Sequence, residues 1–215
     1  MQLIGQFDSP FVRRVGIALK LYGMPFEHTP WSVFRDAELI ARYNPLRRVP
    51  TLVLDDGRVL TETFVCLEVL DDRVATDRGF SSEHLLLPRS GPARHEGLRL
   101  CALASGTADK AVSLAYEREI RENQSRTWVE RCTKQVRECL RLLEIEIDSR
   151  RAKFLLGDRL SHADIAVTCA YTFVTNAHPG FLGPADMPKL RAHAERCEAL
   201  EEFASVFQPF DIPQG

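Results

Sequence analysis

The stretch that decides the fold at the N-terminus is Gln2-Leu3-Ile4-Gly5-Gln6-Phe7-Asp8-Ser9-Pro10-Phe11. It contains an apolar run, then Asp8-Ser9-Pro10, which ends that run, and then the start of a helical pattern. Residues 2–7 are short and largely apolar, which predicts a strand. Ser9 stands where the N-cap of a helix belongs, and Pro10 occupies the first helical position, where its missing N–H and fixed φ suit a helix. Local sequence leaves two interpretations of Ser9, a capping side chain and a functional hydroxyl.

The same alternation of strand and helix continues along the chain. Residues 26–31 predict a second strand, and residues 37–43 a short helix that stops at Asn44-Pro45. A hairpin is expected around Asp55-Asp56-Gly57, because Asp-Gly supplies positive φ between the apolar runs on either side. After Glu62-Thr63, apolar residues interleaved with acidic ones predict a third helix. The expected order is βαβαββα.

The second half of the chain is predicted to be helical. Residues 98–115 and 128–147 each carry an apolar stripe at helical spacing, and Asn123-Gln124-Ser125 separates them. Two long helices joined by a short turn indicate an antiparallel hairpin at the centre of a helical bundle. Ser161-His162-Ala163-Asp164 has the pattern of a capping box, a motif for folding that we place outside the active site.

Composition and charge narrow the function. The chain has 215 residues, a formal net charge of −2 and a sequence pI of about 6.3, which gives no reason to expect nucleic-acid binding. No stretch approaches the roughly 18 consecutive apolar residues that a membrane span needs, and the N-terminus lacks the order of a signal peptide. A cytoplasmic protein without membrane binding is expected. The six cysteines form no Cys-x-x-Cys pair and the histidines no His-x-x-x-His pair, so no metal site is expected.

Four motifs stand in order along the chain: Ser9–Val15, Asn44–Pro50, Glu62-Thr63 and Leu160–Ala166. In order and spacing they resemble the motifs of bacterial glutathione S-transferases, and the likeness extends over nearly the whole chain. The resemblance implies an α/β thioredoxin-like N-terminal domain over residues 1–78, a linker over 79–90, and an all-α helical-bundle C-terminal domain over 91–215 that carries much of the electrophile site.

The resemblance also implies a glutathione site. Pro50 would be cis, and the backbone N–H and C=O of Val49 would pair with the glutathione cysteine. Thr63, at the expected start of a helix, would take the γ-glutamyl carboxylate, because free N–H groups there favour an anion. Glu62 would pair with the ammonium group, and Arg48 with the glycine end. Taken singly, each of these residues also has an ordinary structural interpretation, such as a cap or a solvated surface side chain.

The same resemblance implies a catalytic role for Ser9 in a serine-type enzyme. Its hydroxyl would donate to the glutathione sulfur and stabilise the thiolate without itself being the nucleophile. The electrophile site is expected in a cleft between the domains, with Phe11, Ser105, Asp109 and Tyr116 as candidates. For Asp109 and Tyr116 a solvent-facing or packing role is an equal alternative.

The function implied is that of a glutathione transferase in detoxification, with glutathione as co-substrate, no metal, and a homodimeric assembly. Two alternatives remain open. One is a non-catalytic binding or regulatory protein with the same fold, and the other is a glutathione-dependent peroxidase or isomerase. The sequence around Ser9 lacks the Ser-Ser-Cys turn of the isomerase branch, which weakens the isomerase interpretation and leaves the peroxidase open.

Overall fold

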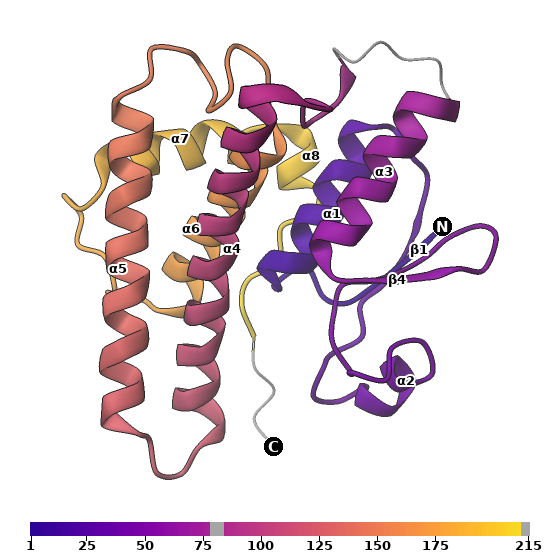
Figure 1. The fold of residues 1–215 in the computed structure, drawn as a ribbon. Coiled ribbons are helices and arrows are strands. Elements are labelled where there is room, and N and C mark those ends of the chain that lie inside the picture. The colour runs from indigo at the N-terminus through magenta and orange to yellow at the C-terminus, as the bar shows by residue number, and fades with distance from the viewer. Residues whose placement is uncertain (78–83, 212–215) are drawn as a thin grey trace. The chain divides into compact units, whose positions relative to one another are not determined.

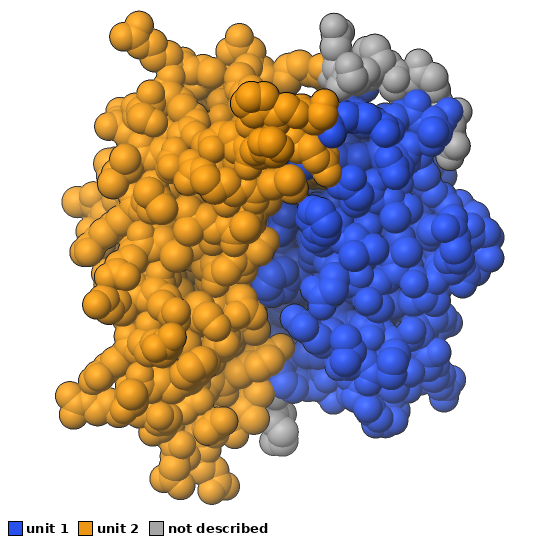
Figure 2. All heavy atoms as spheres, in the orientation of Figure 1, with its two compact units in different colours: residues 1–89, 201–215 blue, residues 90–200 orange. Residues whose placement is uncertain are grey.

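The computed structural model describes residues 1–77 and 84–211 (Figure 1). Its contacts group Met1–Arg89 with Glu201–Gly215 in a first unit, and Ser90–Leu200 form a second unit (Figure 2). The end of the chain thus groups with the thioredoxin-like part, whereas the sequence-based division placed it in a C-terminal domain over 91–215. Part of the expected linker, residues 78–83, lies outside the described residues.

The first unit has the expected order of strands and helices. Its elements are β1 (Gln2–Ile4), α1 (Pro10–Leu21), β2 (Glu27–Thr29), α2 (Ala37–Ala41), β3 (Thr51–Val53), β4 (Val59–Thr61), α3 (Thr63–Asp77) and α8 (Glu201–Ala204). The four-stranded sheet has the order β2-β1-β3-β4, with β1 parallel to β2 and the other pairs antiparallel. This mixed sheet with its helices confirms the thioredoxin-like fold.

The centre of the sheet and two helices form the core of the first unit. Leu3 pairs with His28 of β2 on one side and with Leu52 of β3 on the other. Leu3 and Leu52 are fully buried, as are Ile17 of α1 and Leu70 of α3, two helices that lie side by side (Figure 1). Burial of these large apolar side chains provides the main stabilisation of the unit.

The second unit is helical, as predicted. It contains α4 (Gly91–Ile120), α5 (Arg126–Asp148), α6 (His162–Ala177) and α7 (Pro188–Glu198). Helices α4 and α5 run antiparallel and are joined by a short turn, which confirms the predicted hairpin (Figure 1). Helix α6 packs against α4 and α7 and is buried along most of its length.

The predicted capping box forms at the start of α6. The Asp164 carboxylate is fully buried, and it accepts from the N–H of Ser161 at 2.8 Å and from the N–H of Leu155 at 2.9 Å. The Ser161 hydroxyl donates to the same carboxylate at 2.6 Å. His193 of α7 lies 3.3 Å from it, and burial lowers the pKa of this histidine to about 4. This cluster joins α6, α7 and the preceding loop inside the second unit.

Candidate functional site

Ser9 caps α1 and keeps a free donor. Its φ and ψ are −68° and 121°, and its Oγ accepts from the N–H of Phe11 at 3.3 Å and of Val12 at 3.4 Å. Capping uses the lone pairs of a hydroxyl and leaves its proton available. No acceptor for that proton is found among the described residues. The hydroxyl can therefore cap the helix and donate to a ligand at the same time.

Gly5 joins the start of α1 to the Val49-Pro50 turn. Its φ is +127°, and a Cβ placed on it would lie 2.6 Å from Val12 Cγ2 and 2.8 Å from Val49 Cβ. Two segments therefore pack directly on the α-carbon of this residue, and only glycine leaves room for both. Its place in the site was not predicted. The available signal was a glycine directly after a buried strand, where a close backbone approach is common.

The Val49-Pro50 peptide bond is cis, as the resemblance implies. Asn44, only 2% exposed, frames the turn from inside: its Nδ2 donates to the Arg48 carbonyl at 2.9 Å, and its Oδ1 accepts from the N–H of Leu46 at 3.0 Å. In the part of the chain that the structure describes, the N–H and C=O of Val49 have no hydrogen-bond partner. The turn is fixed by a buried amide while these two groups stay open to a ligand. The sequence indicated Asn44 as part of a helix stop and of the Asn44–Pro50 motif, but it did not predict that the Asn44 side chain fixes this turn.

Glu62 and Thr63 form the start of α3. Glu62 has a φ of +69°, an uncommon conformation for a residue with a side chain, and its carbonyl accepts from the N–H of Cys66 at 3.1 Å. Thr63 is buried, and its hydroxyl donates to the Phe11 carbonyl at 3.4 Å, which ties α3 to the start of α1. Residues held in such positive-φ conformations cluster at ligand sites.

Arg48 and Glu62 meet at the surface of the same site. Arg48 Nη1 lies 3.3 Å from Glu62 Oε1, and the two side chains are 60% and 55% exposed. An ion pair as exposed as this one contributes only about 0–1 kcal/mol in water. Both side chains can exchange this contact for a charged ligand at little loss of free energy.

The structure brings together the predicted residues of the first unit. Ser9, Val49 and Thr63 are linked through Gly5 and the first turn of α1 by the contacts above. The electrophile candidates divide between the units: Phe11 is in the first, and Ser105, Asp109 and Tyr116 lie on α4 of the second. The Asp109 carboxylate there faces Lys110 Nζ at 3.1 Å. These four residues stay candidates.

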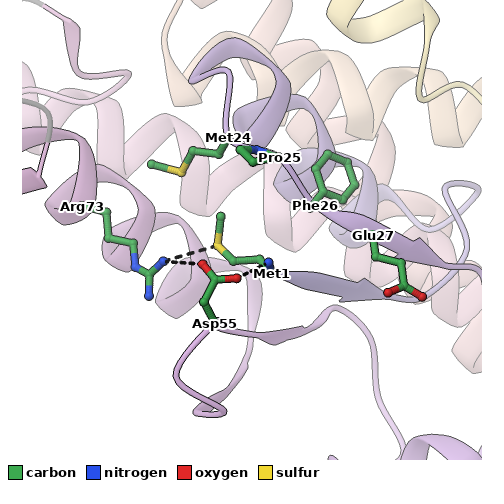
Figure 3. A pocket seen from close by; sticks show the side chains of 7 residues that line it. All are labelled: Met1, Met24, Pro25, Phe26, Glu27, Asp55 and Arg73. Carbon is green, nitrogen blue, oxygen red and sulfur yellow. Dashed lines mark hydrogen bonds and ion pairs between the residues drawn. The ribbon is translucent and has the colours of Figure 1, made fainter.

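A separate cavity of about 480 Å³ lies near the start of β1 (Figure 3). Its lining residues are Met1, Met24, Pro25, Phe26, Glu27, Asp55 and Arg73. The Asp55 carboxylate pairs there with the Met1 ammonium group and, at 3.6 Å, with Arg73. The cavity lies near the start of β1, whereas Ser9 follows the other end of this strand, after Ile4. None of the predicted site residues lines the cavity.

Over residues 1–77 and 84–211, no group of three or more His, Cys, Asp or Glu side chains is placed to hold a metal ion. Within the same ranges, every helix is too short or too polar to cross a membrane.

Comparisons of the sequence with known proteins identify its family. The model of the glutathione S-transferase N-terminal domain matches residues 8–73, and that of the C-terminal domain matches residues 126–196. The chain is 28% identical over 221 residues to a probable glutathione S-transferase, GSTU1, of Oryza sativa subsp. indica, covering 94% of this chain and 87% of the relative. It is 26% identical over 212 residues to the GST-like protein YibF of Escherichia coli K12, covering 97% and 99%.

Solved structures give the same result. A glutathione S-transferase of Methylobacterium radiotolerans, in complex with glutathione sulfonate, superposes with a TM-score of 0.88 at 26% identity, covering 100% of this chain and 97% of that one. A glutathione S-transferase of Methylobacillus flagellatus with bound glutathione superposes with a TM-score of 0.84 at 26% identity, covering 95% and 98%. The chain therefore belongs to the glutathione S-transferase family.

Proposed function

We propose that this protein is a serine-type glutathione transferase, which binds glutathione, stabilises its thiolate with Ser9 and transfers it to a small electrophile. The observation that carries the proposal is the state of the Ser9 hydroxyl. It sits at the N-terminus of a twelve-residue helix, and its proton has no acceptor among the described residues. A free donor beside a helix N-terminus is an environment that favours an anion.

Glutathione binding is supported by three features of the first unit. The unpaired N–H and C=O of Val49 match the backbone of a peptide laid beside the turn as an extra strand. The Thr63 N–H at the start of α3 suits the γ-glutamyl carboxylate, with Glu62 beside it for the ammonium group. Arg48 offers a cation for the glycine end. The glutathione and glutathione sulfonate bound in the two solved relatives support glutathione as the ligand.

Thiolate formation needs a moderate shift in pKa. A free thiol has a pKa of about 8.5, and each unit of lowering requires about 1.4 kcal/mol of preference for the anion. A hydrogen bond to a charged acceptor contributes about 1.5–3 kcal/mol, and an exposed helix N-terminus about 0.3–1 kcal/mol. Together they lower the thiol pKa by about 1–3 units, which is sufficient for a large thiolate fraction near neutral pH.

The proposal also covers the electrophile site, the assembly, the location and the role of the protein. Phe11, Ser105, Asp109 and Tyr116 remain the candidates for electrophile binding. The homodimer fits the exposed apolar side chains Phe64 and Val65 at the start of α3, which are 58% and 42% exposed. We also propose a cytoplasmic location and a detoxifying role, which the composition and the family support.

The test measures the pKa of the thiol of bound glutathione by ultraviolet absorbance and the conjugation of a chloronitroarene. Ser9→Gly keeps most of the capping free energy, since glycine at an N-cap costs only a few tenths of a kcal/mol, but it removes the donor. We expect the thiol pKa to rise by about 1–2 units and turnover at neutral pH to fall about tenfold or more. Ser9→Thr, which keeps a hydroxyl, should retain a lowered pKa.

Ser125→Ala is the matched control. Ser125 caps α5 in the second unit by accepting from the N–H of Trp128 at 3.4 Å, so its loss removes a cap without touching the candidate site. An unchanged thiol pKa in Ser9→Gly would reduce Ser9 to a cap. Glutathione binding without turnover in the wild type would favour the non-catalytic alternative.

A further inference from the structure

The C-terminal segment, residues 201–211, is fastened to α1 within the first unit. Arg13 of α1 is only 3% exposed, and it donates to the carbonyl of Val206 at 3.2 Å and to that of Phe203 at 3.0 Å. Phe203 and Val206 are themselves buried. The Arg13 N–H donates to the Ser9 carbonyl at 3.0 Å, so the same helical turn connects Ser9 to the residue that anchors the segment.

Beyond Val206 the segment reaches the turn that carries Ser9. The N–H of Ser9 donates to the Gln6 carbonyl at 3.2 Å, which makes residues 6–9 a turn with Phe7 and Asp8 at its centre. The N–H of Phe7 has no partner inside such a turn, and it donates to Gln208 Oε1 at 3.1 Å. A partly buried backbone N–H needs an acceptor, and this one is provided 201 positions away in sequence.

The turn is held from the opposite side by β2 and α1. The Phe7 ring stacks on His28 at 3.8 Å between centroids, and it lies against Gly16, where a Cβ would come within 2.6 Å of Phe7 Cε1. These contacts hold the Phe7 ring, and the bond from Gln208 holds the backbone N–H of the same residue.

We propose that Gln208 is a positioning residue for Ser9, because its side-chain carbonyl fixes the turn from which the serine hydroxyl meets the glutathione sulfur. This inference rests on the proposed role of Ser9 as the thiolate donor. Gln208 itself touches no substrate and acts through Phe7 and the turn. A hydroxyl that is free to swing donates less well to the thiolate, since the directional preference of a hydrogen bond is steep.

Three variants test the inference on the full-length chain. Gln208→Leu keeps similar bulk and removes the acceptor, and Gln208→Ser, which is too short to reach Phe7, repeats the test if the leucine variant does not fold. Ser205→Ala is the control, because Ser205 is exposed on the same segment. We expect Gln208→Leu to raise the thiol pKa of bound glutathione by about 0.5–1 unit and Ser205→Ala to leave it unchanged. Affinity for S-methylglutathione, which has no thiol to ionise, should not change.

The decisive measurement is the double variant Ser9→Gly/Gln208→Leu. If Gln208 acts through Ser9, its removal produces no further rise in the thiol pKa once the serine hydroxyl is gone, because the two effects are coupled. An additive rise, or no rise in Gln208→Leu where Ser9→Gly does shift the pKa, would overturn the inference and leave the proposed function standing. A Ser9→Gly variant with unchanged pKa would instead remove the proposed function and the inference together.

Amide hydrogen exchange at Phe7 provides a second readout. The Phe7 N–H should exchange faster in Gln208→Leu and remain protected in Gln208→Glu, whose carboxylate still accepts. Equal protection in all three proteins would show that this bond does not hold the turn, and the positioning role would then be wrong.

Discussion

Gly5→Ala tests whether the close approach at Gly5 holds the proposed glutathione site together. The new Cβ would lie 2.6 Å from Val12 Cγ2, 2.8 Å from Val49 Cβ and 3.0 Å from Val49 Cγ1. A valine Cβ is attached to its backbone, so the Val49 turn itself has to move to relieve the contact. In addition, the alanine would have to adopt a φ of +127°.

The expected destabilisation has two parts. A residue with a side chain in this backbone region costs about 1–3 kcal/mol, and overpacking a filled site costs about 1–3 kcal/mol more. We expect the free energy of unfolding to fall by about 2–6 kcal/mol and, since Val49 shifts, glutathione affinity to fall about tenfold. Urea unfolding and calorimetric titration with glutathione measure the two quantities.

Gly57→Ala separates strain from overlap. Gly57 also has a positive φ, of +83°, but a Cβ there meets nothing within 4 Å. It lies in the hairpin between β3 and β4, away from the candidate site. This variant should lose about 1–2 kcal/mol of stability and keep full affinity for glutathione. If both variants lose equal stability and neither loses affinity, Gly5 does not couple the start of α1 to Val49, and the reasoning from its contacts is refuted.

Three further predictions concern charged side chains. Asp164→Ala should lower the free energy of unfolding by about 3–5 kcal/mol in urea, because it leaves three buried donors unpaired, and a loss below 1 kcal/mol would contradict the geometry of the capping box. Burial raises the pKa of Asp8 from 3.8 to about 6, so the stability that its neutral form contributes is present below pH 4 and is lost as the pH rises through 6. Between pH 4 and 7 the free energy of unfolding of the wild type should therefore fall by about 2–3 kcal/mol more than that of Asp8→Asn. Urea unfolding at several pH values measures this, and an equal fall in both proteins would contradict the prediction. Arg48→Ala should weaken glutathione binding less than about fivefold in calorimetry, because the side chain is exposed, and a hundredfold loss would make Arg48 a principal ligand.

The order of elements in the first unit could be predicted because each signal is local. Alternating apolar residues, the Ser9-Pro10 helix start and the Asp-Gly hairpin depend on neighbours within a few positions. The ends of elements were less predictable. The first strand was expected to continue to Phe7, but β1 ends at Ile4, because Gly5 leaves the extended conformation to let Val12 and Val49 approach. The alternation of residues in a strand does not indicate which distant side chains, here Val12 and Val49, pack against a glycine.

The contacts that organise the site left no pattern in the sequence. Asn44 has a local signature as a helix stop, yet its side chain serves the turn before Pro50 by bonding to the Arg48 carbonyl. Gln208 is a single polar residue between Phe207 and Pro209 near the end of the chain, and it bonds to Phe7 across 201 positions. The Asn44 bond is local, within the turn before Pro50, but the bond between Gln208 and Phe7 has no fixed spacing and forms only after folding has brought these distant residues together.

Ser9 explains why a capping residue and a catalytic donor could not be told apart by sequence. The cap requires an oxygen that accepts from the N–H groups of Phe11 and Val12, and the proposed chemistry requires the proton on that same oxygen. A serine before a proline meets both requirements, so the local motif is the same for a capping serine and for a catalytic one. The two roles differ in what surrounds Ser9, namely in whether unpaired backbone groups lie close enough to bind a peptide thiol. In the proposed site, Gly5 allows Val49, with its unpaired N–H and C=O, to pack close to the start of α1. The proposed role of Ser9 as a thiolate donor therefore depends on the residues packed around it, and not on its local motif alone.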